Sequence, residues 1–252
     1  VAATAFRAAA ERLEYCAGAS KAAERARGAF ASDAMPPPEL APAVLRALVE
    51  LFMAQADQMT MIKAVETGKS GKIVSGLAQG VSVRYAKAAS ELESYAAAVA
   101  ADAAGGGDGA LRGDLIPRAH ALAAAYSGVA RLAMARFILL DTEIGRAIAL
   151  LRDALARFDA FDFAALASAH PATLGAVAEL ASALRVECAA ELAKQEQSNG
   201  LLLDPVPAAP DTIAPLSLSK SIPYDLPAAS ALVSFARDPS AVGSAAPPPE
   251  PA

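Results

Sequence analysis

Residues 123–155 read AAAYSGVARLAMARFILLDTEIGRAIALLRDAL, and this stretch decides the fold class. Alanine, which has the highest intrinsic helix propensity, recurs through both halves of the stretch. Small residues at Ala125 and Ala130 in the first half, and at Gly145 and Ala147 in the second, allow two helices to approach closely. Polar residues around Asp141 separate the two halves. The stretch therefore predicts two closely packed helices with a break between them.

Small residues are used in this way by tetratricopeptide (TPR) repeats, although their period of about 34 residues is not sustained here. We therefore predict an all-α fold, a TPR-like helical solenoid of about six helices with irregular lengths. Apolar spacing and helix-breaking residues place these helices at about 4–30, 42–66, 72–103, 115 to a break near 141, from there through 156, and 170–198. Gly200 is expected to end the last of them.

The pattern changes after the last predicted helix. Prolines recur between Pro205 and Pro227, which predicts an extended, proline-containing strap that begins near Leu201. Residues 241–252 read AVGSAAPPPEPA and have polyproline character. We expect one helical domain over 1–235 and a disordered tail rich in proline and alanine over 236–252.

Composition excludes several classes of protein. Hydrophobic residues make up 55% of the 252 residues and charged residues 19%, which is incompatible with wholesale disorder. The net charge of −5 argues against nucleic-acid binding, because phosphate contacts need a basic surface. Arg131 and Arg136 interrupt the most apolar window, so a membrane-spanning helix is not expected. No signal peptide is visible, and we expect a soluble, cytoplasmic protein with reduced thiols.

The sequence offers little that indicates catalysis. Thr67–Ser70 (TGKS) is similar to the end of a phosphate-binding loop, but it follows a helix and lacks the first glycine, so a helix–helix turn is preferred. His120 and His170 belong to no metal-ligand motif, and the two cysteines, Cys16 and Cys188, have no histidine nearby in sequence. We expect no catalytic residues, no metal and no cofactor.

Two further segments are interpreted as connections between helices. Gly105–Gly109 (GGGDG) lacks the alternating oxygen ligands of a calcium loop and is expected to be a linker. Residues 157–169 contain FDAFDF and are expected to form a short connector anchored by Phe158, Phe161 and Phe163.

Four segments together resemble the Bro1 domain, the helical domain of ALIX and related endosomal-sorting proteins. FMAQADQMTMIKA (52–64) is similar to the family's apolar helix with an AQAQ-like element, in which Asp57 replaces the last glutamine. Residues 71–92 and 114–140 are similar to the two helices that follow in the family. QSNGLLLDPVPAAPDTIAPLSLSKSIP (197–223) is similar to the family's closing segment, except that Leu202 and Leu203 replace an aromatic–histidine pair.

The resemblance implies a fold and a function. Residues 1–235 would be the C-terminal portion of a Bro1-type domain, without the family's usual N-terminal portion. The chain would be a non-catalytic endosomal-sorting adaptor that binds the C-terminal amphipathic helix of an ESCRT-III subunit in multivesicular-body sorting and membrane remodelling. It would be recruited to endosomes and would meet membranes only through its partners.

The helix predicted over 42–66 is apolar on more than one face, which is typical of a helix that is either buried between its neighbours or presents a surface to a partner. Helix-in-groove recognition uses such apolar rows. We place the partner-binding apolar patch at Leu45, Leu48, Leu51 and Phe52; a purely structural role in the core is the alternative for each. The alternative function is a generic TPR-like interaction module, or a structural subunit, with another peptide partner. The oligomeric state is not predicted.

Overall fold

In the computed structural model, the described residues are 2–27, 41–102 and 114–216. They belong to one compact unit, residues 1–222. They form seven helices: α1 (Ala2–Arg27), α2 (Pro42–Glu66), α3 (Gly71–Asp102), α4 (Leu115–Leu139), α5 (Ile144–Asp159), α6 (Phe163–Ala169) and α7 (Pro171–Leu202). The predicted linker at Gly105–Gly109 and the predicted tail over 236–252 lie outside the described residues.

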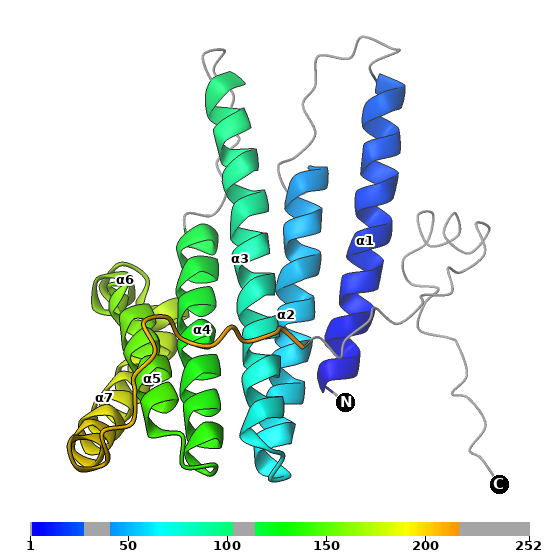
Figure 1. Ribbon diagram of the computed structural model, residues 1–252. Helices are drawn as coiled ribbons and strands as arrows, with labels where there is room; N and C mark the ends of the chain where they lie inside the picture. The colour runs from blue at the N-terminus through cyan, green and yellow to red at the C-terminus, as the bar shows by residue number, and fades with distance from the viewer. Residues whose placement is uncertain (1, 28–40, 103–113, 217–252) are drawn as a thin grey trace, which may run out of the picture. The chain divides into compact units, whose positions relative to one another are not determined.

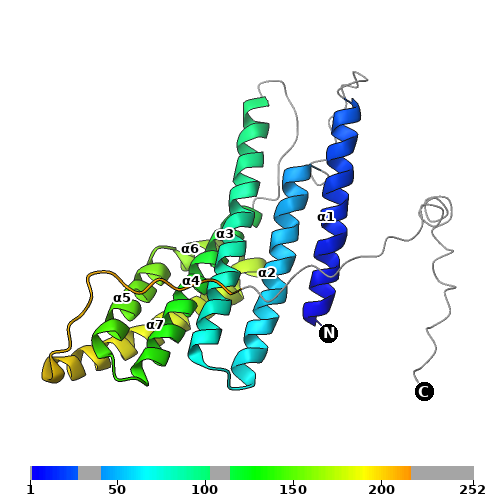
Figure 2. The ribbon, with the colours of Figure 1, turned by 45° about the vertical axis from the view of Figure 1, so that its right-hand side comes forward.

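Each helix from α1 to α4 packs against the next one, and α7 packs against α5 and α6 (Figures 1 and 2). The all-α, TPR-like array predicted from the sequence is confirmed. The TGKS segment is the tight turn between α2 and α3, where Lys69 N donates a hydrogen bond of 2.9 Å to Ala64 O. The main core joins α2, α3, α4, α5 and α7, and alanines such as Ala130 and Ala147 are fully buried in it. Small side chains thus let these helices pack closely, as the opening stretch of sequence predicted.

The region predicted as a connector is more ordered than expected. α5 continues to Asp159, and α6 follows within the segment that was expected to be irregular. The Asp162 carboxylate caps α6 by accepting a hydrogen bond of 2.9 Å from Ala165 N. Of the three predicted phenylalanine anchors, Phe158 is buried, whereas Phe161 and Phe163 are half-buried with ring centroids 5.8 Å apart.

The last helix ends later than the sequence predicted. Gly200 lies inside α7, and Leu203 adopts the left-handed conformation (φ 56°) that ends the helix. The Asn199 side chain accepts a hydrogen bond of 2.9 Å from Asp204 N and donates one of 3.0 Å to Asp204 O. These two bonds fix the reversal at Leu203, which explains why the glycine is not the residue that ends the helix.

Residues 203–216 form the described part of the predicted strap (Figure 1). The Asp204 carboxylate accepts a hydrogen bond of 2.6 Å from Gly145 N at the start of α5, where free amide groups favour a negative charge. Further along, Asp211 pairs with Arg146 at 2.6 Å, and Ile213 is buried in the core. At its end Leu216 N donates a hydrogen bond of 2.8 Å to Gly76 O on α3. The strap therefore ties α7, α5 and α3 together.

One helix, α4, is long and apolar enough to cross a membrane by length and composition alone. Half of its most apolar window is buried inside the protein. Arg131 in that window pairs with Asp153 of α5 and donates a hydrogen bond of 3.1 Å to Gln79 of α3. These contacts are those of a central helix in the array.

The two cysteines are expected to differ strongly in reactivity. Cys16 is exposed, whereas Cys188 is buried and its Sγ lies 3.5 Å from Leu151 O. Burial raises the pKa of the Cys188 thiol to about 11, so about one thiol in a thousand is ionised at pH 8. Ellman's reagent should therefore modify one thiol quickly at pH 8 and the second at least about a hundredfold more slowly. The slow rate should rise about tenfold per pH unit between pH 8 and pH 10, because the thiolate fraction does.

Cys16→Ser should remove the fast phase, and denaturant should make both thiols of the original chain react at once. Two equally fast thiols in the folded protein would contradict the packing of α7 against α5.

Candidate functional site

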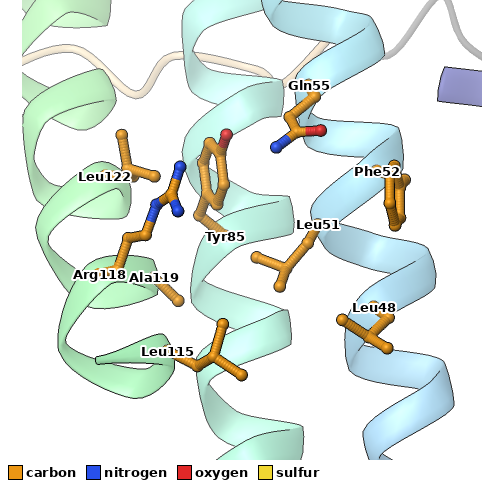
Figure 3. A pocket seen from close by; sticks show the side chains of 9 residues that line it. All are labelled: Leu48, Leu51, Phe52, Gln55, Tyr85, Leu115, Arg118, Ala119 and Leu122. Carbon is orange, nitrogen blue, oxygen red and sulfur yellow. The ribbon is translucent and has the colours of Figure 1, made fainter. Parts of the chain in front are cut away.

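A mostly apolar hollow of about 160 Å³ lies across α2, α3 and α4 (Figure 3). α2 forms one wall with Leu48, Leu51, Phe52 and Gln55, and α4 forms the opposite wall with Leu115, Arg118, Ala119 and Leu122. Tyr85 of α3 lies between the two walls. We call these nine residues the hollow.

The two walls repeat the same spacing. Positions 48, 51/52 and 55 on α2, and positions 115, 118/119 and 122 on α4, follow the three- and four-residue steps that place side chains on one helical face. Each wall runs over eight residues, and the seven steps from its first to its last residue cover about 10 Å along a helix axis. The hollow is therefore about two helical turns long.

Three of the four residues predicted for a partner-binding patch line this hollow, namely Leu48, Leu51 and Phe52. Leu45 does not, because it is only 4% exposed and belongs to the core. Leu45 and Phe52 are seven residues apart and therefore lie within about 20° of each other around the helix. Helical spacing therefore cannot predict which of the two side chains is exposed. Leu45 is buried by its tertiary contacts. Leu45 is thus removed from the predicted patch.

The residues from α3 and α4 were not predicted. The row of Leu115, Arg118 and Leu122 was visible in the sequence as a helical face, but nothing in the sequence placed it opposite α2. No pattern in the sequence predicted Tyr85 as part of a binding site. Its hydroxyl donates a hydrogen bond of 3.4 Å to Gln58 Oε1, and its ring stacks on Tyr126 with centroids 6.1 Å apart.

The electrostatics of the hollow are simple. Burial raises the pKa of Tyr85 to about 12, and the nearby Arg118 guanidinium opposes that shift. Tyr85 is therefore neutral at physiological pH, and Arg118 is the charged residue of the hollow. A neutral phenol, an amide and an arginine provide no nucleophile with an adjacent base, so the hollow is suited to binding rather than to bond chemistry.

The histidines lie elsewhere and apart. His120 pairs with Glu93 at 2.7 Å, and its ring stacks on Phe161 with centroids 6.4 Å apart. His170 precedes α7 as its N-cap residue. Across the described parts of the chain, no group of three or more histidine, cysteine or acidic residues could hold a metal ion.

A family model for the BRO1-like domain matches residues 1–239 of the chain. Among curated proteins, none matches. Three solved structures are similar in fold. One is ALIX in complex with the SIVmac239 PYKEVTEDL late domain, with 17% identity and a TM-score of 0.67 over 90% of this chain and 28% of that one.

The second structure is the ALIX BRO1–CHMP4C complex, with 17% identity and a TM-score of 0.67 over 90% of this chain and 56% of that one. The third is a Bro1-domain structure described as the basis for endosomal targeting by that domain. It has 14% identity and a TM-score of 0.65 over 86% of this chain and 53% of that one. This chain thus spans about half the length of each of the two Bro1-domain structures, and less than a third of the longer ALIX chain. The resemblance predicted from the sequence is confirmed by the family model, and the chain belongs to the BRO1-like domain family.

Proposed function

We propose that this chain is a non-catalytic adaptor of endosomal sorting that binds the C-terminal amphipathic helix of an ESCRT-III subunit in the hollow. The observation that carries the proposal is the hollow itself: two apolar walls on α2 and α4 in a member of a family of which one domain has been solved with CHMP4C. Recruitment to endosomes and contact with membranes would follow from the partner, in multivesicular-body sorting and membrane remodelling.

The shape of the hollow suits a helical ligand. An amphipathic helix presents apolar anchors at positions i, i+3 or i+4, and i+7. Such a row covers about 10 Å, which is the length of each wall. Leu48 and Leu51 on one side, and Leu115 and Leu122 on the other, offer apolar contacts to both flanks of that row. Phe52 also packs toward α1, since its ring centroid lies 6.1 Å from that of Phe6.

The alternative is a TPR-like module or structural subunit that holds another peptide. Both functions use the hollow, so the identity of the ligand distinguishes them. A titration of the fluorescein-labelled C-terminal helix of CHMP4C, followed by fluorescence anisotropy, should show saturable binding if the adaptor proposal holds.

Leu48→Asp should weaken this binding at least about tenfold, equivalent to about 1.4 kcal/mol, because it places a carboxylate in the apolar wall. Leu48 also packs against the smaller core cluster around Val44 and Leu92, so circular dichroism must show that the variant is folded. Gln55→Arg is a second variant that fills the hollow without removing an apolar contact. Ile73→Asp is the matched control, because Ile73 is 39% exposed on α3 and lies outside the hollow.

Loss of binding in both hollow variants, with wild-type affinity in Ile73→Asp, would support the proposal. Loss of binding in Ile73→Asp alone, with wild-type affinity in the two hollow variants, would contradict the proposal and indicate a site near the turn between α2 and α3. No saturable binding by the folded wild-type chain would favour a different peptide partner.

A further inference from the structure

Large apolar side chains are strongly exposed at one end of the helical array. Four such side chains of the described residues are at least 65% exposed. They lie in two places: Leu140 in the turn after α4, and Leu201, Leu202 and Leu203 at the end of α7. Single exposed apolar residues are ordinary, but a gathering of them marks a contact surface.

Three helix turns lie side by side at this end, which is the lower one in both views (Figures 1 and 2). The end of α7 lies beside the α4–α5 turn, because Gly145 N donates a hydrogen bond of 2.6 Å to the Asp204 carboxylate. The α2–α3 turn lies beside the last turns of α4, because a Cβ on Gly71 would be 3.0 Å from Phe137 Cβ. We call this end of the array the edge, which comprises residues 62–72, 140–145 and 201–204.

Leu203 is an unusual residue for its place on the edge. Its backbone is left-handed (φ 56°), a conformation that glycine and asparagine adopt at the lowest cost. The bonds between Asn199 and Asp204 explain the backbone reversal, but they make no use of a leucine side chain. Most of that side chain is exposed, so packing within the described residues does not account for it either. A contact outside the array does.

Positive charge is concentrated at one part of the edge. Lys63, Lys69 and Lys72 are exposed around the α2–α3 turn, with one acidic residue, Glu66, between them. This turn therefore has a net charge of +2 in a chain whose net charge is −5. Charges act locally, since salt screens them over about 8 Å in physiological solution. A surface of negative groups would thus be attracted to this turn although the whole chain is acidic.

The turns that carry the leucines oppose this attraction only weakly. Arg146 pairs with both Glu143 and Asp211, and the Asp204 carboxylate accepts its hydrogen bond from the start of α5. Asp141 remains as an exposed acidic residue. Negative groups would therefore be held mainly at the lysine-bearing turn, with the leucines beside it.

We propose that the edge lies on a membrane surface with anionic headgroups, with the leucines in the interfacial layer and the lysines at the headgroups. The contact does not depend on the hollow or on the peptide proposed to occupy it. It would add to the membrane contact made through the partner. It thus departs from the expectation, drawn from the family resemblance, that the partner alone provides that contact.

A lipid surface fits this arrangement better than a protein partner. The leucines lie at the ends of helices and do not line the hollow described above, so they offer an anchor side chain no walls. Interfacial binding needs exposed apolar area and attraction to anionic lipids rather than a shaped pocket. Lysine suits this setting, because its apolar stem lies along apolar groups while its ammonium group reaches the headgroups.

The first test uses a fluorescent reporter on the full chain. The chain contains no tryptophan, so a single introduced indole reports its own surroundings. With vesicles of phosphatidylcholine and phosphatidylserine, Leu202→Trp should emit at shorter wavelength and be quenched by brominated lipid, because its indole leaves water. With vesicles of phosphatidylcholine alone, the change should be much smaller. Val186→Trp is the matched control, since Val186 is nearly as exposed on α7 but lies outside the edge, and its emission should not change.

The second test measures vesicle binding by co-sedimentation. Leu201→Gln, Leu202→Gln and Leu203→Asn together should weaken binding to the mixed vesicles at least about tenfold, because less apolar area enters the lipid. Leu180→Gln with Val186→Gln, on the outer face of α7, should bind like the wild type. Circular dichroism should show that both variants are folded.

The lysines are tested against a control of equal charge change. Lys69→Gln with Lys72→Gln should weaken binding to the mixed vesicles at least about fivefold. Lys21→Gln with Lys87→Gln removes the same charge from α1 and from the middle of α3, and should change binding little.

Equal vesicle binding by the wild type and the leucine variant, or a wavelength shift in Val186→Trp as large as in Leu202→Trp, would overturn the proposal. Absence of vesicle binding by the folded wild type would also overturn it and would leave the proposed function standing. Self-association that the leucine variant loses, without vesicle binding, would assign the edge to contact between two copies of the chain and overturn the membrane proposal.

Discussion

Replacing Arg84 with methionine should lower the free energy of unfolding by about 3–5 kcal/mol, because it removes the arginine that pairs with a buried carboxylate. Asp57 is 0% exposed, and its Oδ2 accepts a hydrogen bond of 2.8 Å from Arg84 Nε. The same guanidinium donates a hydrogen bond of 2.9 Å to Glu50, so one arginine of α3 holds two acidic residues of α2. Urea denaturation, followed by circular dichroism at the helix band, measures the change.

Two controls test whether the loss of stability comes from the buried Asp57 charge. Asp57→Asn combined with Arg84→Met should recover much of the lost stability, because the buried negative charge that Arg84 neutralises is then also removed. Arg46→Met should cost less than about 1 kcal/mol, because the pair of Arg46 with Glu91 is largely solvent-exposed, with 51% of the arginine side chain accessible. A loss no larger in Arg84→Met than in Arg46→Met would show that the Asp57 pair does not hold α2 and α3 together.

Replacing Gly145 with alanine should also destabilise the protein, by about 1–3 kcal/mol through overpacking. Helix propensity alone predicts the opposite sign, since alanine is favoured over glycine in a helix by up to about 1 kcal/mol. The reason is the strap: a Cβ at position 145 would lie less than 3.0 Å from the carbonyl oxygen of Pro205. To relieve that overlap the strap would have to move, and the hydrogen bond from Gly145 N to Asp204 would weaken.

Gly175→Ala on α7 is the matched control, because a Cβ at that position meets no atom within 4 Å. It should leave the melting temperature unchanged or raise it. Gly80→Ala should behave like Gly145→Ala, because its Cβ would meet the carbonyl oxygen of Leu216 at the other end of the strap. Stabilisation by both Gly145→Ala and Gly80→Ala would mean that the strap does not lie against α5 and α3 in solution.

Helix positions could be predicted well from the sequence where local signals were strong. α2 begins at Pro42 and ends at Glu66, as proline at its start and the TGKS turn at its end predicted. The end of α7 could not be predicted, because Gly200 is a strong local signal that the bonds between Asn199 and Asp204 override. α6 was missed because it is a single short helix held by one cap, at Asp162.

The hollow could be predicted only in part. The apolar row on α2 was found by periodicity, but the same periodicity included Leu45, which the tertiary structure buries. Asp57 was recognised as a departure from the family's pattern, yet its partner Arg84 lies 27 residues further along the chain. The placement of the α2 and α4 walls around Tyr85 of α3 depends on contacts between helices that no local pattern encodes.

Hydrogen exchange of the full chain, measured by mass spectrometry with and without saturating CHMP4C C-terminal helix, tests the central proposal most directly. It reports where the peptide binds without changing any residue of the chain. We predict slower exchange in the segments of α2 and α4 that form the walls of the hollow, residues 48–55 and 115–122, and unchanged exchange in α7. Unchanged exchange throughout, or protection confined to α5–α7, would contradict the account.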